Sequence, residues 1–264
     1  MRGTISHPKA LVIAAAMAAA ILAFPGLGAS APAARGADQT DVAGALRAKL
    51  DKSQYKNVQV SVDANDVATL SGTVSLYEYK ADADKTAHKV KGVKAVRNDI
   101  EVAGPNVPDD QLQKTLAEKL TYNGVGYGNV FDAISVEVRD GVATLGGHVH
   151  DYPNRDSALA TVATTPGVKD MVDEIAVDPV STMDNQTRIA VARAIYSFPS
   201  LNRYAIDPAM PIRISVQNGN VELYGLVDSE ADKDAAGIRA NSVPGVFSVK
   251  NYLQVAGQPT ESKP

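Results

Sequence analysis

Apolar and polar positions follow the same order three times along the chain. Each copy opens with apolar residues at helical spacing, which predict an amphipathic helix: Val42, Ala45, Leu46, Leu50; Leu112, Leu116, Leu120; and Ile189, Ala192, Ile195. Apolar residues at alternate positions follow and predict a half-buried strand: Val58, Val60, Val62; Ile134, Val136, Val138; and Ile212, Ile214, Val216. Three similar segments therefore begin with a helix and a strand.

A glycine near the end of a second predicted strand marks each copy. These glycines are Gly72, Gly147 and Gly225. Each second strand is preceded by a pair of residues that tolerates positive φ and closes a hairpin, at 65–66, 140–141 and 218–219. Another glycine follows 20 residues later, at Gly92, Gly167 and Gly245. Identical spacing in all three copies indicates an internal repeat, and we expect all six glycines to be structural.

A second helix is predicted between the two glycines of each copy. Ser75 and Glu78 have the spacing of a capping box, and Asp228 occupies the equivalent position in the third copy. The helix is expected to end at the second glycine, which can take a left-handed conformation. The last strands are predicted over 96–102, 171–177 and 249–255.

The α-β-β-α-β order predicts an α+β fold of three tandem units. Each unit should hold a small mixed three-stranded sheet with two helices on one face, because the second helix connects parallel strands. The other face of each sheet should remain available. We place the units at 40–103, 108–178 and 184–256, followed by a disordered tail at 257–264.

The repeated motifs resemble those of the BON domain, a family named for osmotically induced periplasmic and nodulation proteins. They are the L-x-G-x-V strand ends at 70–74, 145–149 and 223–227, and the G-V-x-x-V starts of the last strand at 92–96 and 245–249. The second copy departs from the latter only at Met171. The resemblance implies a non-enzymatic domain that attaches to phospholipid membranes or other envelope components.

Residues 1–33 have the layout of a secretory signal peptide. Arg2 and Lys9 precede an apolar run of 15 residues at 10–24, and small residues follow. The run is shorter than the roughly 20 residues that span a bilayer, which makes a retained anchor the weaker alternative. We therefore expect an exported, periplasmic protein.

Composition removes several functional classes. With no cysteine among its 264 residues, the chain has no disulfide, thiolate nucleophile or lipid-modified cysteine. A net charge of −4 argues against a general nucleic-acid binder. His148 and His150 could form a metal pair, but no third ligand has suitable spacing. We expect no carboxylate at a fixed place in the repeat, and hence no enzyme, cofactor, metal or small-molecule substrate.

Two groups of residues are candidates for binding a partner. The first copy holds 10 basic residues against 9 acidic ones, whereas the second holds 5 against 12. Lys85, Lys89, Lys91 and Lys94 gather along the second helix and exit loop of the first copy, where they would attract anionic headgroups or form an ordinary solvated face.

The connections between the first helix and first strand of copies two and three are enlarged and rich in aromatic residues. They hold Tyr127, Phe131, Phe198 and Tyr204. Such residues suit a membrane interface or a protein partner, or they fold back to cover the core.

The leading hypothesis is therefore an exported envelope protein whose repeats bind anionic phospholipid. The alternative is a periplasmic stress or chaperone-like protein that holds unfolded or envelope protein clients.

Overall fold

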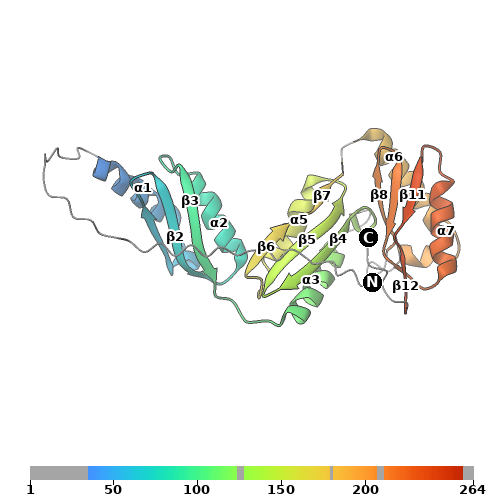
Figure 1. The fold of residues 1–264 in the computed structure, drawn as a ribbon, viewed down its shortest axis with the longest axis horizontal. Helices are drawn as coiled ribbons and strands as arrows, with labels where there is room; N and C mark the ends of the chain where they lie inside the picture. Colours follow the sequence, from blue (N-terminus) through green and yellow to red (C-terminus); the bar gives the residue numbers. More distant parts are fainter. Residues whose placement is uncertain (1–34, 124–127, 179–180, 207–210, 258–264) are drawn as a thin grey trace, which may run out of the picture. The chain divides into compact units, whose positions relative to one another are not determined.

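The computed structural model describes residues 35–123, 128–178, 181–206 and 211–257. The predicted signal peptide, Tyr127 and residues 258–264 of the predicted tail lie outside them. Three α+β units follow one another along the chain (Figure 1). The first unit, repeat 1, has these elements: α1 (Arg35–Lys49), the 3₁₀ helix η1 (Ser53–Tyr55), β1 (Val58–Val62), β2 (Val67–Val74), α2 (Tyr77–His88) and β3 (Ala95–Val102).

Repeats 2 and 3 contain the same elements with additions. Repeat 2 has α3 (Asp109–Asn123), α4 (Gly128–Phe131), β4 (Ala133–Arg139), β5 (Val142–Val149), α5 (Tyr152–Ala163), β6 (Asp170–Asp173) and β7 (Ala176–Val177). Repeat 3 has α6 (Thr182–Tyr196), η2 (Asn202–Ala205), β8 (Arg213–Gln217), β9 (Asn220–Tyr224), β10 (Leu226–Val227), α7 (Glu230–Asn241), β11 (Ser248–Asn251) and β12 (Gln254–Val255).

The sheet of each repeat is mixed, as predicted. In repeat 1, β1 pairs antiparallel with β2, and β2 pairs parallel with β3. The other two repeats have the same arrangement. Leu46 of α1 and Ala83 of α2 share one buried cluster with Leu70 of β2, so both helices cover one face of the sheet. The predicted fold class is confirmed.

The last strands of repeats 2 and 3 are broken, where the sequence predicted continuous ones. β6 ends at Asp173, and β7 begins at Ala176. At the break in repeat 2, the Asp173 carboxylate accepts a hydrogen bond from the Ile175 backbone N–H at 3.1 Å. At the break in repeat 3, the Asn251 side-chain oxygen accepts one from the Leu253 backbone N–H at 3.2 Å. This side-chain hydrogen bond accompanies the break but is not sufficient to cause it. Asn98 makes the same bond in β3, which remains continuous.

The second helices start one residue later than predicted. The N-cap residues are Leu76, Asp151 and Ser229. Asp151 and Ser229 accept a hydrogen bond from the backbone N–H three residues on, whereas Leu76 has no oxygen to offer, so the proposed caps Ser75 and Asp228 are wrong. The helices end three residues short of the second glycines, whose φ angles are +99°, +99° and +90°.

A carboxylate has the same role in repeats 2 and 3, where none was expected at an equivalent place. Asp109 of α3 accepts hydrogen bonds from the backbone N–H groups of Asp140 and Gly141 at 2.6 and 2.9 Å. Asp184 of α6, 75 positions later in the sequence, accepts two such bonds from residues 218 and 219, both at 2.9 Å. These side chains fasten the first helix to the hairpin turn, which is a structural role.

The first glycine of each copy allows two backbones to approach closely. Gly147 has φ +94°, and a Cβ there would lie 1.9 Å from the carbonyl oxygen of Ala133. The corresponding distances at Gly72 and Gly225, to Asn57 and Pro211, are 2.1 and 2.6 Å. The neighbouring Gly146 faces only the movable Ser135 hydroxyl, at 3.2 Å.

Gly147→Ala should therefore lower the free energy of unfolding by about 2 kcal/mol or more, because both the clash and the positive φ oppose a side chain. Gly146→Ala is the matched control, one residue away, and should change it by much less. Urea denaturation of both variants measures the difference. Equal midpoints would show that the close approach is not required.

Candidate functional site

Each repeat has two distinct ends along its strands. The hairpin end carries the turn between the first two strands, the last turn of the second helix and the start of the last strand. The corner end, at the other end of the first strand, carries the connection from the first helix. One backbone hydrogen bond defines the three hairpin ends as equivalent: Lys94 to Asp66 at 2.9 Å, Lys169 to Gly141 at 2.9 Å and Phe247 to Gly219 at 2.8 Å, each from N–H to carbonyl oxygen.

The four candidate lysines lie at the hairpin end of repeat 1. All four are exposed. Lys94 forms an ion pair with Asp66 at 2.6 Å, whereas Lys85, Lys89 and Lys91 have no carboxylate partner among the residues that the structure describes. Three solvated ammonium groups are therefore free to meet an anion.

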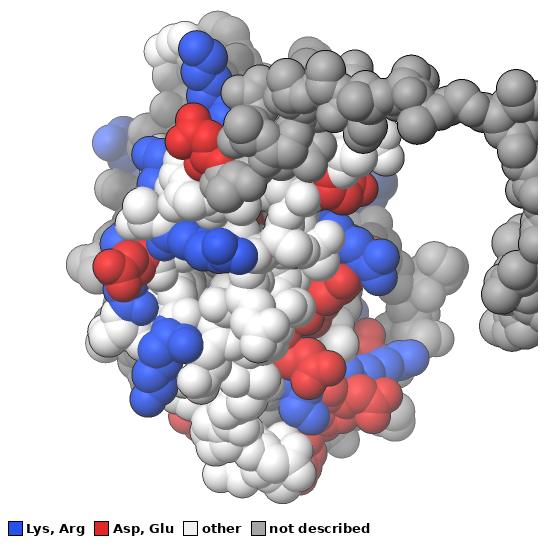
Figure 2. Space-filling model, turned by 90° about the vertical axis from the view of Figure 1, so that its left-hand side faces the viewer, with Lys and Arg blue, Asp and Glu red and all other residues white. Residues whose placement is uncertain are grey.

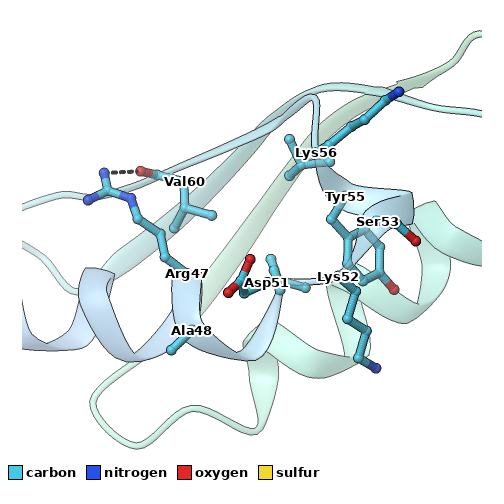
Figure 3. Close-up of a pocket in the computed structure, with 10 residues that line it drawn as sticks. Arg47, Ala48, Asp51, Lys52, Ser53, Tyr55, Lys56 and Val60 are labelled. Atoms are coloured by element: carbon cyan, nitrogen blue, oxygen red, sulfur yellow. Dashed lines mark hydrogen bonds between the residues drawn. The ribbon is translucent and has the colours of Figure 1, made fainter.

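Further cationic residues lie at the corner end of repeat 1, and sequence reasoning did not single them out. Arg47, Lys52 and Lys56 line an open cavity of about 510 Å³. Figure 3 shows their side chains extending in different directions, with the Asp51 carboxylate between them. The Arg47 guanidinium donates a hydrogen bond to the Val60 carbonyl oxygen at 2.8 Å. Divergent cations around a carboxylate do not form an organised anion site.

The side of the molecule drawn in Figure 2 shows how charges are distributed there. Lys and Arg side chains are interspersed with Asp and Glu around an uncharged central area. The described residues on this side therefore form no continuous basic surface.

The candidate aromatic residues of the enlarged connections belong to the core. Phe131 and Tyr204 are 5% and 2% exposed, and Phe198 packs against the same apolar cluster. The Tyr204 hydroxyl donates a hydrogen bond to Asp232 at 3.0 Å and accepts one from the Asp228 N–H at 2.8 Å. Burial removes the rings of Phe131 and Tyr204 from the surface, so these two do not form an exposed binding corner, whereas Phe198 is partly buried. Covering the core was the alternative interpretation.

The two histidines of β5 and its exit do not share a site. The Nδ1 atom of His148 lies 3.4 Å from the Asp178 carboxylate, while that of His150 lies 2.8 Å from Asp132. Among the described residues, no group of three or more His, Asp or Glu side chains could hold a metal ion. His148 therefore lies beside Asp178, whereas His150 lies beside both Asp132 and Asp151.

A buried ion pair connects repeat 2 with repeat 3. Asp178, which follows β7, is fully buried and lies 3.2 Å from the Arg188 guanidinium of α6. It also accepts hydrogen bonds from Ser215 at 2.9 Å and Gln217 at 2.7 Å, both on β8. These contacts cover part of the outer face of the repeat 3 sheet, which was expected to be available.

A smaller cavity of about 310 Å³ lies beside this ion pair. It is lined by His150, Asp151, Asn185 and Arg188, among others. Arg188 already donates hydrogen bonds to the Asn185 side chain at 3.1 Å and to Asp178, and the His150 side chain is hydrogen-bonded to Asp132. The buried Nε atom of Arg188 has no hydrogen-bond partner among the described residues, so one polar atom of the lining remains unpaired.

Three tandem α+β units define a protein built from repeated modules. The BON domain family model matches residues 38–104, 108–179 and 200–257. The chain therefore belongs to the BON domain family. The third match begins after α6, although Ile195 of that helix is buried in the core of repeat 3.

Similar proteins were found among curated sequences and solved structures. Osmotically-inducible protein Y of Escherichia coli K12 is 31% identical over 123 residues, which are 46% of this chain and 61% of that protein. The C-terminal domain of CdsD, a structural protein of the type III secretion system of Chlamydia trachomatis, is 16% identical over 83% of this chain and 98% of that one, with a TM-score of 0.25. The PrgH periplasmic domain is 9% identical over 76% and 95%, with a TM-score of 0.17.

Within the described ranges, no helix has the length and apolarity needed to cross a bilayer.

The His150–Asp132 contact predicts a pH dependence of stability. The hydrogen bond to Asp132 raises the pKa of His150 above its ordinary value, and burial opposes the rise. Because the pKa is raised in the folded state, His150 contributes fully to the free energy of unfolding below its unfolded-state pKa of about 6.5. This contribution is lost as the pH rises through the pKa of the folded state.

The free energy of unfolding should therefore fall from about pH 6 to about pH 8 more steeply for the natural protein than for His150→Gln. Urea denaturation across that range measures both slopes, with His88→Gln, an exposed substitution on α2, as the control. Parallel curves for the natural protein and His150→Gln would contradict the assignment.

Proposed function

We propose that this chain is an exported, non-enzymatic envelope protein that binds anionic phospholipid surfaces through the hairpin end of repeat 1. The observation that carries the proposal is the group of exposed lysines, Lys85, Lys89 and Lys91, that lacks carboxylate partners among the described residues. Membership of the BON domain family and the signal-peptide layout of residues 1–33 support the location.

The attraction of these lysines is large enough to matter. Each lysine near an anionic membrane contributes about 1 kcal/mol, so three would strengthen binding on the order of 100-fold. Salt should weaken the attraction, since exposed charges are screened over about 10 Å at 0.1 M ionic strength. Repeat 2, with 12 acidic residues against 5 basic ones, would be repelled by the same surface, so we do not expect it to contribute to binding.

A role in stress is part of the proposal. The name of the Escherichia coli relative states that it is osmotically inducible, and we extend to this chain a function in the envelope under osmotic stress. The alternative, client binding through aromatic corners, loses its main candidates because Phe131 and Tyr204 are buried.

Charge reversal tests the proposal. The triple variant Lys85→Glu, Lys89→Glu, Lys91→Glu should lose most of its flotation with phosphatidylglycerol-containing vesicles at low salt, because attraction becomes repulsion.

The control triple variant Lys49→Glu, Lys52→Glu, Lys56→Glu changes the net charge equally but lies at the corner end, and should retain more binding. Equal losses would indicate a nonspecific effect of net charge. A natural protein that stays unbound at low salt would refute the proposal.

A further inference from the structure

The hairpin end of repeat 3 has an exposed phenylalanine where the other two repeats have lysine. Phe247 occupies the position of Lys94 and Lys169, as the shared backbone hydrogen bond to the hairpin turn shows. Its side chain is 80% exposed, the highest value among the large hydrophobic residues that the structure describes. Ile238, on the last turn of α7, occupies the position of Lys85 and is 69% exposed.

The backbone beneath Phe247 is well defined. Its N–H donates to the Gly219 carbonyl oxygen at 2.8 Å, and its ring lies against Gly219, where a Cβ would come within 2.5 Å of the ring atom Cδ2. The Asp184 carboxylate also holds this turn, because it accepts hydrogen bonds from the backbone N–H groups of residues 218 and 219. The protein therefore holds this aromatic ring outward on a fixed support.

Charged residues are missing from the two segments that form this tip. Residues 217–220 and 241–248 contain no Asp, Glu, Lys or Arg, whereas residues 88–94 of repeat 1 contain three lysines. Two charged side chains nearby are already engaged: Asp184 is buried, and the Arg239 Nε donates to the Ala194 carbonyl oxygen at 3.2 Å. An apolar phase that meets these two segments therefore desolvates no charged side chain belonging to them.

We propose that the hairpin end of repeat 3, tipped by Phe247, inserts into the interfacial region of a lipid bilayer. This inference rests on the proposed function, to which it adds a second point of contact of a different kind. Exposed aromatic side chains favour the headgroup level of membranes.

A lipid surface fits this tip better than a protein does. Phe247 and Ile238 together could bury at most roughly 400 Å² of side chain, which is about half of what each partner in a stable protein interface contributes. A bilayer needs no matching surface, and one protruding ring is enough to add to an electrostatic contact. Two weak membrane contacts, here the lysines of repeat 1 and the ring of Phe247, together give a more stable attachment than either one alone.

The absence of tryptophan from the chain allows a direct test. Phe247→Trp in the full chain introduces a single indole fluorophore at the tip. With phosphatidylglycerol-containing vesicles, its emission should shift to the blue, and brominated lipids should quench it. Ile206→Trp is the matched control, because Ile206 is 76% exposed and follows η2 at the corner end of the same repeat. Its emission should not change.

The outcomes separate this inference from the proposed function. Flotation of the same samples reports binding independently of the fluorescence. Bound Phe247→Trp protein with unshifted emission, or an equal shift in the control variant at position 206, overturns the insertion and leaves the lysine contact standing. A chain that does not bind at low salt overturns both. A blue shift that appears without vesicles and grows with protein concentration identifies a second copy as the occupant and overturns the inference.

A second variant measures the contribution of the ring itself. Phe247→Ser should reduce the binding that remains at high salt by roughly tenfold, since apolar contact is not screened. Unchanged high-salt binding would contradict insertion of the ring.

Discussion

The close approach of two backbones at the first glycine of each copy is the constraint on which each unit depends. A sheet of three short strands covered by two helices buries few residues, and domains of this size are marginally stable. The second strand therefore passes directly against the backbone at the start of the first strand, as Gly147 does against Ala133. This contact fixes the point at which the connection from the first helix ends and the first strand begins. All three repeats have it.

The order of elements could be predicted from the sequence because it is encoded locally. Helical and alternating spacings of apolar residues, together with turn pairs such as Asn218-Gly219, define helices, strands and hairpins without reference to distant residues. Details that depend on tertiary partners were missed. The role of Asp184 depends on a turn 34 residues away. The caps are local contacts, and they lay one residue later than predicted. The contact of Asp178 with Arg188 and Ser215 joins two repeats and has no local signature.

The candidate binding residues also differ in how far local sequence determines their exposure. The lysines of repeat 1 could be found from the sequence because an unpaired cation stays in water unless a partner is nearby. The aromatic residues of the enlarged connections were ambiguous, since a ring such as Phe131 can be exposed or buried with equal local plausibility. Phe247 was missed because it is a single residue, although alignment of the three copies places it at the position equivalent to Lys94 and Lys169.

We propose that stability depends on what the repeats share and that binding depends on what differs at their hairpin ends. Amide hydrogen exchange of the full chain, with and without anionic vesicles, tests this division most directly. We expect slower exchange in peptides that cover residues 85–97 and 238–248, with no change over the cationic corner at 47–58. Protection at that corner, or no protection at either hairpin end, would contradict it.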